Sequence, residues 1–130
     1  MRAEKVVSFL LNDDSTIASI VDEKIYGGVA LKGTAAPMLV YAKQSASRSV
    51  DLSAEAAVVT ALIDVLVVAR TYQELKALSE AVRLAVAYKY GEIAGVENVE
   101  TQINDEGPDE YDPDLNEFAQ VWTFNVVHVE

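Results

Sequence analysis

The sequence predicts an α+β fold, a mostly antiparallel sheet packed against helices, as a single small domain over residues 1–130. Two short helical patterns open the chain, and one long amphipathic helix lies between two regions of strand-like alternation. The 130 residues are 51% hydrophobic, which suffices for one core. No internal repeat or linker divides the chain.

The first two elements are short helices. Residues 3–12 carry Val6, Val7, Leu10 and Leu11 on one side of a helix. A second helix from about 15 to 22 follows Asp13 and Asp14, two acids that favour the positive end of a helix dipole. This role explains the pair better than a catalytic carboxylate pair does.

The middle of the chain predicts two strands. Ile25 and Tyr26 lead into a turn at Gly27-Gly28, a loop spans 29–37, and residues 38–43 form a strand. The segment 44–53 contains four serines, and we expect an exposed connection there.

Residues 57–69 give the strongest strand signal, and both faces of this strand are largely apolar. One face carries Val59, Ala61, Ile63, Val65 and Val67, and the other carries Val58, Leu62, Leu66 and Val68 with Thr60 and Asp64. A sheet with helices on one side should be polar on its second face. We therefore expect something to cover the second face, and another subunit is one candidate. Asp64 is expected to pair with a base on its own face, either Arg70 or Arg48.

The last elements are one helix and two strands. Thr71 and Glu74 have the spacing of a capping box, so a helix begins there; it is expected to reach about Tyr90, with Gly91 as its stop. Strands follow at 96–103 and 118–129, and Trp122 and Phe124 point to the core. The acidic segment 104–117 joins the two strands.

Charge is distributed unequally along the chain. The net charge is −11, the last lysine or arginine is Lys89, and residues 90–130 contain eleven acids. This balance argues against nucleic-acid binding, which requires basic side chains on phosphates. The absence of cysteine excludes disulfides, thiol nucleophiles and cysteine zinc sites. No signal peptide or membrane-spanning run is expected, which fits a protein that stays in the cell.

Candidate chemistry is sparse. Asp112, Asp114 and Asn116 match the opening of a calcium loop, but Glu117 and Thr123 stand where glycine and glutamate are required. A solvated acidic loop is the simpler interpretation. His128 is expected to be exposed at a strand end, and no catalytic triad or glycine-rich phosphate loop is evident. We expect no enzymatic activity, catalytic residue, metal or cofactor.

The order of these elements resembles a known family. The residues that carry the resemblance are Ile25-Tyr26, Pro37-Met38-Leu39-Val40-Tyr41, Ile63-Asp64-Val65, Ala69 with Thr71-Tyr72, the helix with Leu75, Leu78, Ala81 and Val82, and the final Phe118, Trp122 and Phe124. From about residue 15 to the end, the chain is similar to the tail completion proteins of long-tailed bacteriophages, also called tail terminator or tail-to-head joining proteins. One departure is Val29-Ala30-Leu31, where the family often has an early proline.

The resemblance implies a structural virion protein at the head–tail junction, assembled in a bacterial cytoplasm. Its partners would be copies of itself in a ring, commonly a hexamer, together with the tail tube protein and a head-completion or connector protein. DNA would pass through the ring. We expect Val58, Leu62, Leu66, Val68 and Arg48 at the subunit interface, and Asp109, Glu110, Asp112 and Asp114 in partner binding or along the channel.

Other functions remain open on the residues alone. The chain fits another head–tail connector or minor tail protein. In different classes, it fits a small metal- or ligand-binding domain that uses the acidic 105–117 loop, or a regulatory protein that mimics nucleic acid.

Net charge yields a first prediction. Copies that each carry −11 repel one another, and salt screens that repulsion over about 8 Å at physiological ionic strength. Self-association should therefore strengthen with salt, which sedimentation velocity across a salt series measures. An oligomer size independent of salt contradicts this.

Overall fold

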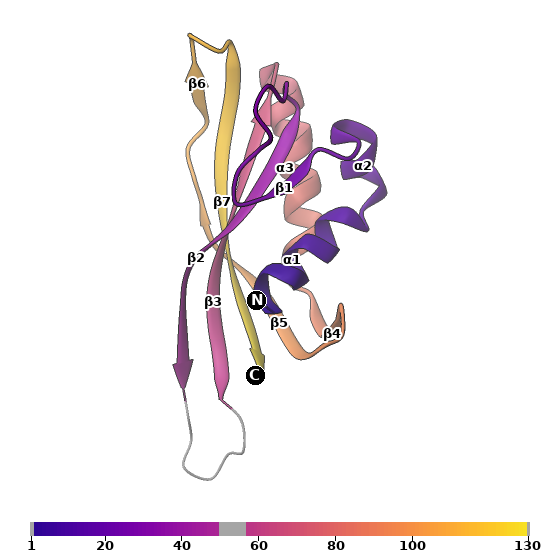
Figure 1. Ribbon diagram of the computed structural model, residues 1–130, viewed down its shortest axis with the longest axis vertical. Coiled ribbons are helices and arrows are strands. Elements are labelled where there is room, and N and C mark those ends of the chain that lie inside the picture. The colour runs from indigo at the N-terminus through magenta and orange to yellow at the C-terminus, as the bar shows by residue number, and fades with distance from the viewer. Residues whose placement is uncertain (1, 50–56, 130) are drawn as a thin grey trace.

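The computed structural model describes residues 2–49 and 57–129. Its helices all lie on one side of a curved sheet, as Figure 1 shows. They are α1 (Arg2–Asn12), α2 (Ser15–Val21) and α3 (Tyr72–Val86). The α+β architecture predicted from the sequence is confirmed.

Within the described residues, seven strands form the sheet. They are β1 (Ile25–Gly27), β2 (Met38–Ser49), β3 (Val58–Ala69), β4 (Tyr90–Ile93), β5 (Val96–Glu106), β6 (Glu110–Asp112) and β7 (Glu117–Val129). Their spatial order is β1-β2-β3-β7-β5-β4, and β6 pairs with β7 beyond the end of β5. Only β1 and β2 run parallel among these pairs.

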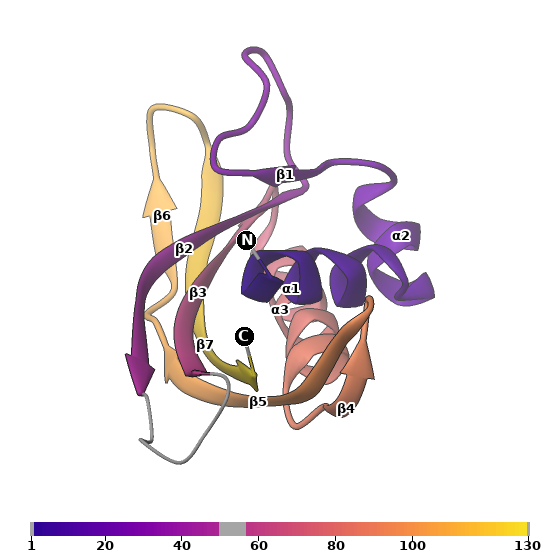
Figure 2. The same cartoon turned by 60° about the horizontal axis from the view of Figure 1, so that its bottom comes forward.

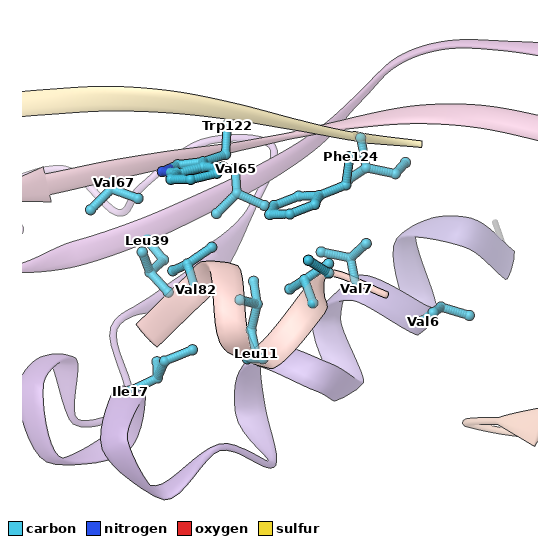
Figure 3. Close-up of a cluster of buried hydrophobic side chains, with 14 of the residues drawn as sticks. Val6, Val7, Leu11, Ile17, Leu39, Val65, Val67, Val82, Trp122 and Phe124 are labelled. Carbon is cyan, nitrogen blue, oxygen red and sulfur yellow. The ribbon is translucent and has the colours of Figure 1, made fainter. Parts of the chain in front are cut away.

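The core fills the concave side of the sheet. Every second side chain of β3 from Val59 to Val67 points into the core. The register places Trp122 and Phe124 of β7 beside Val65 and Ile63. These side chains meet Val7 and Leu11 of α1 and Val82 of α3 (Figure 3). Figure 2 shows α1 and α3 inside the curve of the sheet. The predicted core orientation of Trp122 and Phe124 is confirmed.

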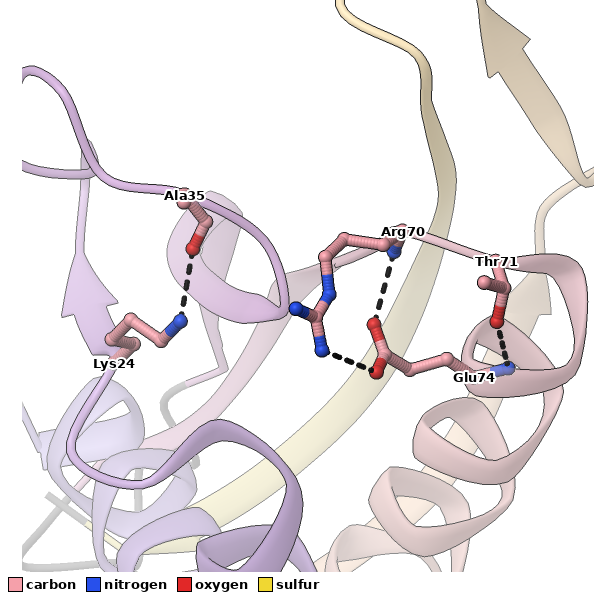
Figure 4. Close-up of polar contacts among 5 residues, drawn as sticks. All are labelled: Lys24, Ala35, Arg70, Thr71 and Glu74. Carbon is pink, nitrogen blue, oxygen red and sulfur yellow. Dashed lines mark hydrogen bonds and ion pairs between the residues drawn. The ribbon is translucent and has the colours of Figure 1, made fainter.

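Helix starts follow the predicted capping residues. The Asp14 carboxylate accepts the Ile17 amide at 2.9 Å, and the Thr71 hydroxyl accepts the Glu74 amide at 3.1 Å. Glu74 reaches back to accept the Arg70 amide at 3.0 Å and pairs with the Arg70 guanidinium (Figure 4). Figure 4 also shows Lys24 donating to the Ala35 carbonyl at 2.9 Å, which ties down the 29–37 loop.

The predicted end of the long helix is wrong. Helix α3 ends at Val86, and Gly91 belongs to β4 instead of stopping a helix. The buried hydroxyl of Thr101 in β5 donates to the Val86 carbonyl and accepts the Lys89 amide at 2.8 Å. Tyr88 has a positive φ of 58°, so the chain turns here from helix to strand.

Two segments predicted to be irregular contain strands. Residues 44–49 continue β2, with a register shift between Lys43 and Ser45; the rest of the predicted 44–53 connection lies outside the described residues. In the 104–117 segment, β5 continues to Glu106 and residues 110–112 form β6. Residues 25–27 also form a strand before the chain turns at Gly28, which has a φ of 82°.

The Thr101 hydroxyl yields a stability prediction. Thr101→Val keeps the side-chain shape but leaves the Val86 carbonyl and Lys89 amide without this partner. The free energy of unfolding should fall by about 1–3 kcal/mol, measured by urea denaturation. Thr101→Ser keeps the hydroxyl and is the control. Equal loss in both variants would contradict the role of the hydroxyl.

Candidate assembly surfaces

The face of the sheet opposite the helices, here called the open face, carries apolar side chains. The register aligns Val40, Leu66 and Val121 in one row across β2, β3 and β7. Val58 and Val121 are 41% and 39% exposed, and Leu62 and Leu66 are half-buried. Val68 is only 8% exposed. Of the predicted interface residues, Val58, Leu62 and Leu66 are therefore accessible from solvent in the single chain, and Val68 is buried.

Arg48 does not share the open face. The register shift at Gln44 changes which side chains of β2 point to which side of the sheet. Ala42 lies opposite Asp64 on the open face, but beyond the shift Arg48 lies opposite Val59, whose side chain faces the core side. The expectation that Arg48 lies on the same face as Asp64 is therefore wrong, because the bulge puts Arg48 on the side of Val59.

A polar pair interrupts the open face. Asp64 accepts a hydrogen bond from the Thr123 hydroxyl at 2.7 Å, and the Gln44 amide nitrogen lies 3.4 Å from the same oxygen. Arg70, one of the two predicted partners of Asp64, pairs with Glu74 instead. Asp64 is therefore held by neighbouring strands of its own sheet.

The acidic arm, residues 105–117, is folded against β7 and α3. The Gly107 amide donates to the Val121 carbonyl at 2.8 Å, and the Gly107 carbonyl accepts from the Gln120 side chain at 2.8 Å. Gln120 in turn accepts from the buried Ser79 hydroxyl of α3 at 2.7 Å. A Cβ atom on Gly107 would lie 2.6 Å from the Val121 oxygen, so only glycine fits this approach.

Asp109 anchors the arm to α3. Its carboxylate lies 2.6 Å from the Lys76 ammonium and accepts from the Tyr72 hydroxyl at 2.9 Å. The hydrogen bond from Lys76, followed by that from Tyr72, lowers the pKa of Asp109. Phe118 packs between Tyr72 and Tyr111, with ring centroids 5.9 Å and 4.8 Å away. The contact of Asp109 with Tyr72 was not evident from the sequence, because the two residues are far apart along the chain.

The other predicted partner-binding acids point elsewhere. Glu110, Asp112 and Asp114 are exposed. Asp112 accepts the backbone amides of Asp114 and Leu115 at 2.9 and 3.3 Å, so the calcium-like sequence forms a local turn. In residues 2–49 and 57–129, no group of three or more histidine, aspartate or glutamate side chains is arranged to hold a metal ion.

His128 corrects a further expectation. The predicted exposed histidine is only 3% exposed, because β7 stays paired to its end and His128 lies opposite Val59 on the helix side. Its Nδ1 lies 3.2 Å from the Val129 carbonyl oxygen.

None of the described helices is long and apolar enough to cross a membrane.

The anchor of the arm generates a prediction. Asp109→Ala removes the partner of Lys76 and Tyr72, so amides 107–112 should exchange with deuterium faster, as mass spectrometry measures. Glu110→Gln, a neighbouring change without this contact, should leave exchange unchanged. The pKa of Asp109 is lower in the folded protein than the value of about 3.9 for an unfolded chain. The anchor therefore contributes its full stability above about pH 3.9, and this contribution is lost as the pH falls through the pKa of Asp109 in the folded protein. Unchanged exchange in Asp109→Ala would contradict the anchor.

Comparisons with known proteins agree with this architecture. The family model described as tail completion protein gp17 matches residues 5–128. The fold is similar to that of a chain in the virion of the native gene transfer agent (GTA) particle, with a TM-score of 0.76 and 17% identity over 99% of this chain and 96% of that chain. A comparison with curated proteins gave no match. Because the family model covers nearly the whole sequence, the chain belongs to the tail completion protein gp17 family, structural proteins of the phage virion tail.

Proposed function

We propose that copies of this chain form a ring, of six subunits in the family pattern, at the end of the phage tail tube. The ring stops tube growth and presents a surface to a connector protein of the head. DNA passes through the ring. The role needs no bond-making chemistry and no cofactor.

The open face carries this proposal. A sheet covered by helices on one side only should be polar on the other side. Here the row Val40, Leu66 and Val121 crosses three strands with apolar side chains. A neighbouring subunit that packs on Val58, Leu62 and Leu66 removes this surface from water, at about 25 cal/mol for each Å² of apolar area buried. Val68 is buried in the single chain, but it lies two residues beyond Leu66 on the same face of β3 and so borders the same contact.

The acidic arm supplies the second contact of the proposed assembly. Asp109 holds the arm on α3, so Glu110, Asp112 and Asp114 are displayed on a fixed support. These three carboxylates are then available to a partner in the assembled tail.

The ring predicts unequal effects of two leucine substitutions. Leu66→Gln places an amide in the proposed interface and should reduce ring formation and capped tube ends, counted by electron microscopy with purified tail tubes. Leu84→Gln changes a leucine that is 57% exposed on α3 and should leave both counts unchanged. Chemical denaturation of both variants checks that they stay folded.

Wild-type protein that leaves tube ends bare would contradict the capping role. Rings that form equally well with Leu66→Gln would contradict the open face as the interface.

A further inference from the structure

Strand β2 has an open edge. One side of β2 pairs with β3 along residues 38–49, whereas β1 covers the other side only from Leu39 to Tyr41. From Ala42 to Ser49, no strand within the described parts of the chain pairs with that outer side. Alternate backbone N–H and C=O groups along it therefore point away from the sheet, ready to pair with an added strand.

A groove of about 500 Å³ lies where β1 stops. Its lining comes from the first turns of α1, the end of β1 and the open edge of β2: Glu4, Lys5, Ser8, Gly27, Gly28, Tyr41, Ala42 and Lys43. Gly28, with its φ of 82°, directs the chain away, so β1 does not continue along β2. The Tyr41 ring lies so close to Gly27 that a Cβ there would be 3.0 Å from its hydroxyl oxygen.

The groove combines an unpaired strand edge with positive charge. Lys5 and Lys43 line it, and among the described residues of the lining Glu4 is the one acid. A segment that fits must be extended, so that it can pair with β2, and acidic, so that it complements the two lysines.

The acidic arm has both properties. Residues 105–117 contain seven acids and no lysine or arginine. Strand β6 pairs with β7 on one side, and no described strand pairs with its other side. Leu115 in the same arm is 66% exposed.

The strand order keeps the arm of one chain from its own groove. Strands β1 and β2 form one edge of the sheet, and β6 lies on the opposite side of β7 from β3. A second copy must therefore supply the arm.

We infer that the groove beside Ala42 and Lys43 binds the acidic arm of a neighbouring copy, with β6 adding to the open edge of β2. Groove and arm are different surfaces, so the contact is head-to-tail, the type that closes into a ring when the rotation between copies permits. Pairing groove with groove would oppose lysines, and pairing arm with arm would oppose carboxylates. The inference rests on the proposed ring and names its second contact.

The absence of native cysteine permits a direct test. Ala42→Cys and Leu115→Cys are made in separate chains, mixed on tail tubes and oxidised, because a disulfide forms only when the two Cα atoms lie within about 7 Å. A disulfide-linked dimer on a non-reducing gel is expected. The control mixes Ala42→Cys with Leu84→Cys, a leucine exposed on α3, and should give no dimer.

A charge exchange provides the second measurement. At one fixed ionic strength, Lys43→Glu should reduce the fraction of capped tubes several-fold, and adding Glu110→Lys in the same chain should restore it. Circular dichroism confirms that both variants are folded. The double variant regains the net charge of −11, so Lys43→Glu combined with Glu23→Lys, an exposed acid outside the arm that also returns the charge to −11, is the control and should not restore capping.

The outcomes separate this inference from the proposed function. Capped tubes without the Ala42–Leu115 disulfide, or with equal cross-linking of the control, overturn the groove contact and leave the ring intact. The disulfide without capped tubes supports the groove contact and contradicts the capping role. An arm from another virion protein in the groove would also overturn the inference, since the disulfide between copies would then be absent.

Discussion

The structure depends on one constraint, that helices cover only the concave face of the sheet. Every second residue of β3 from Val59 to Val67 packs against the helices, together with Trp122, Phe124 and Val126 of β7. The other side of β3 and β7 carries further apolar side chains, such as Leu66 and Val121, and a single chain leaves part of that surface in water. Soluble proteins rarely keep an extended apolar patch exposed without a partner. The proposed assembly follows from this imbalance.

The same sheet extends beyond its helical cover, and its edges differ chemically. The β2 edge carries Lys43 and Arg48, whereas the β5 and β6 edge carries Asp105, Glu106, Glu110 and Asp112. Exposed edges normally risk unspecific pairing, and charge is a common protection. Because the two edges carry opposite charge, the same edge of two copies repels itself. The basic edge of one copy can instead pair with the acidic edge of another. The contacts of Asp109 with Lys76 and Tyr72 keep the acidic edge in a fixed position.

The sequence patterns correctly predicted those features that depend only on residues close together in the chain. The alternation of 57–69, the caps at Asp14 and Thr71 and the core role of Phe124 are properties of short segments, and each is confirmed. The end of α3 depends on Thr101, and β6 depends on pairing with β7, so neither was visible locally. The serine-rich end of β2 forms a strand because β3 offers it a partner, which overrides weak propensity. The bulge at Gln44 could not be predicted from the sequence, and it places Arg48 on the opposite face of the sheet from Asp64.

The most direct test of the covered open face is hydroxyl-radical footprinting of the free protein and of the protein assembled on tail tubes. Oxidation of Leu62, Leu66 and Val121 should fall on assembly if a neighbour covers the open face, while oxidation of Leu84 on α3 should stay the same. Equal oxidation of the three open-face residues in both states would show that no neighbour covers them, and would contradict the proposed ring interface.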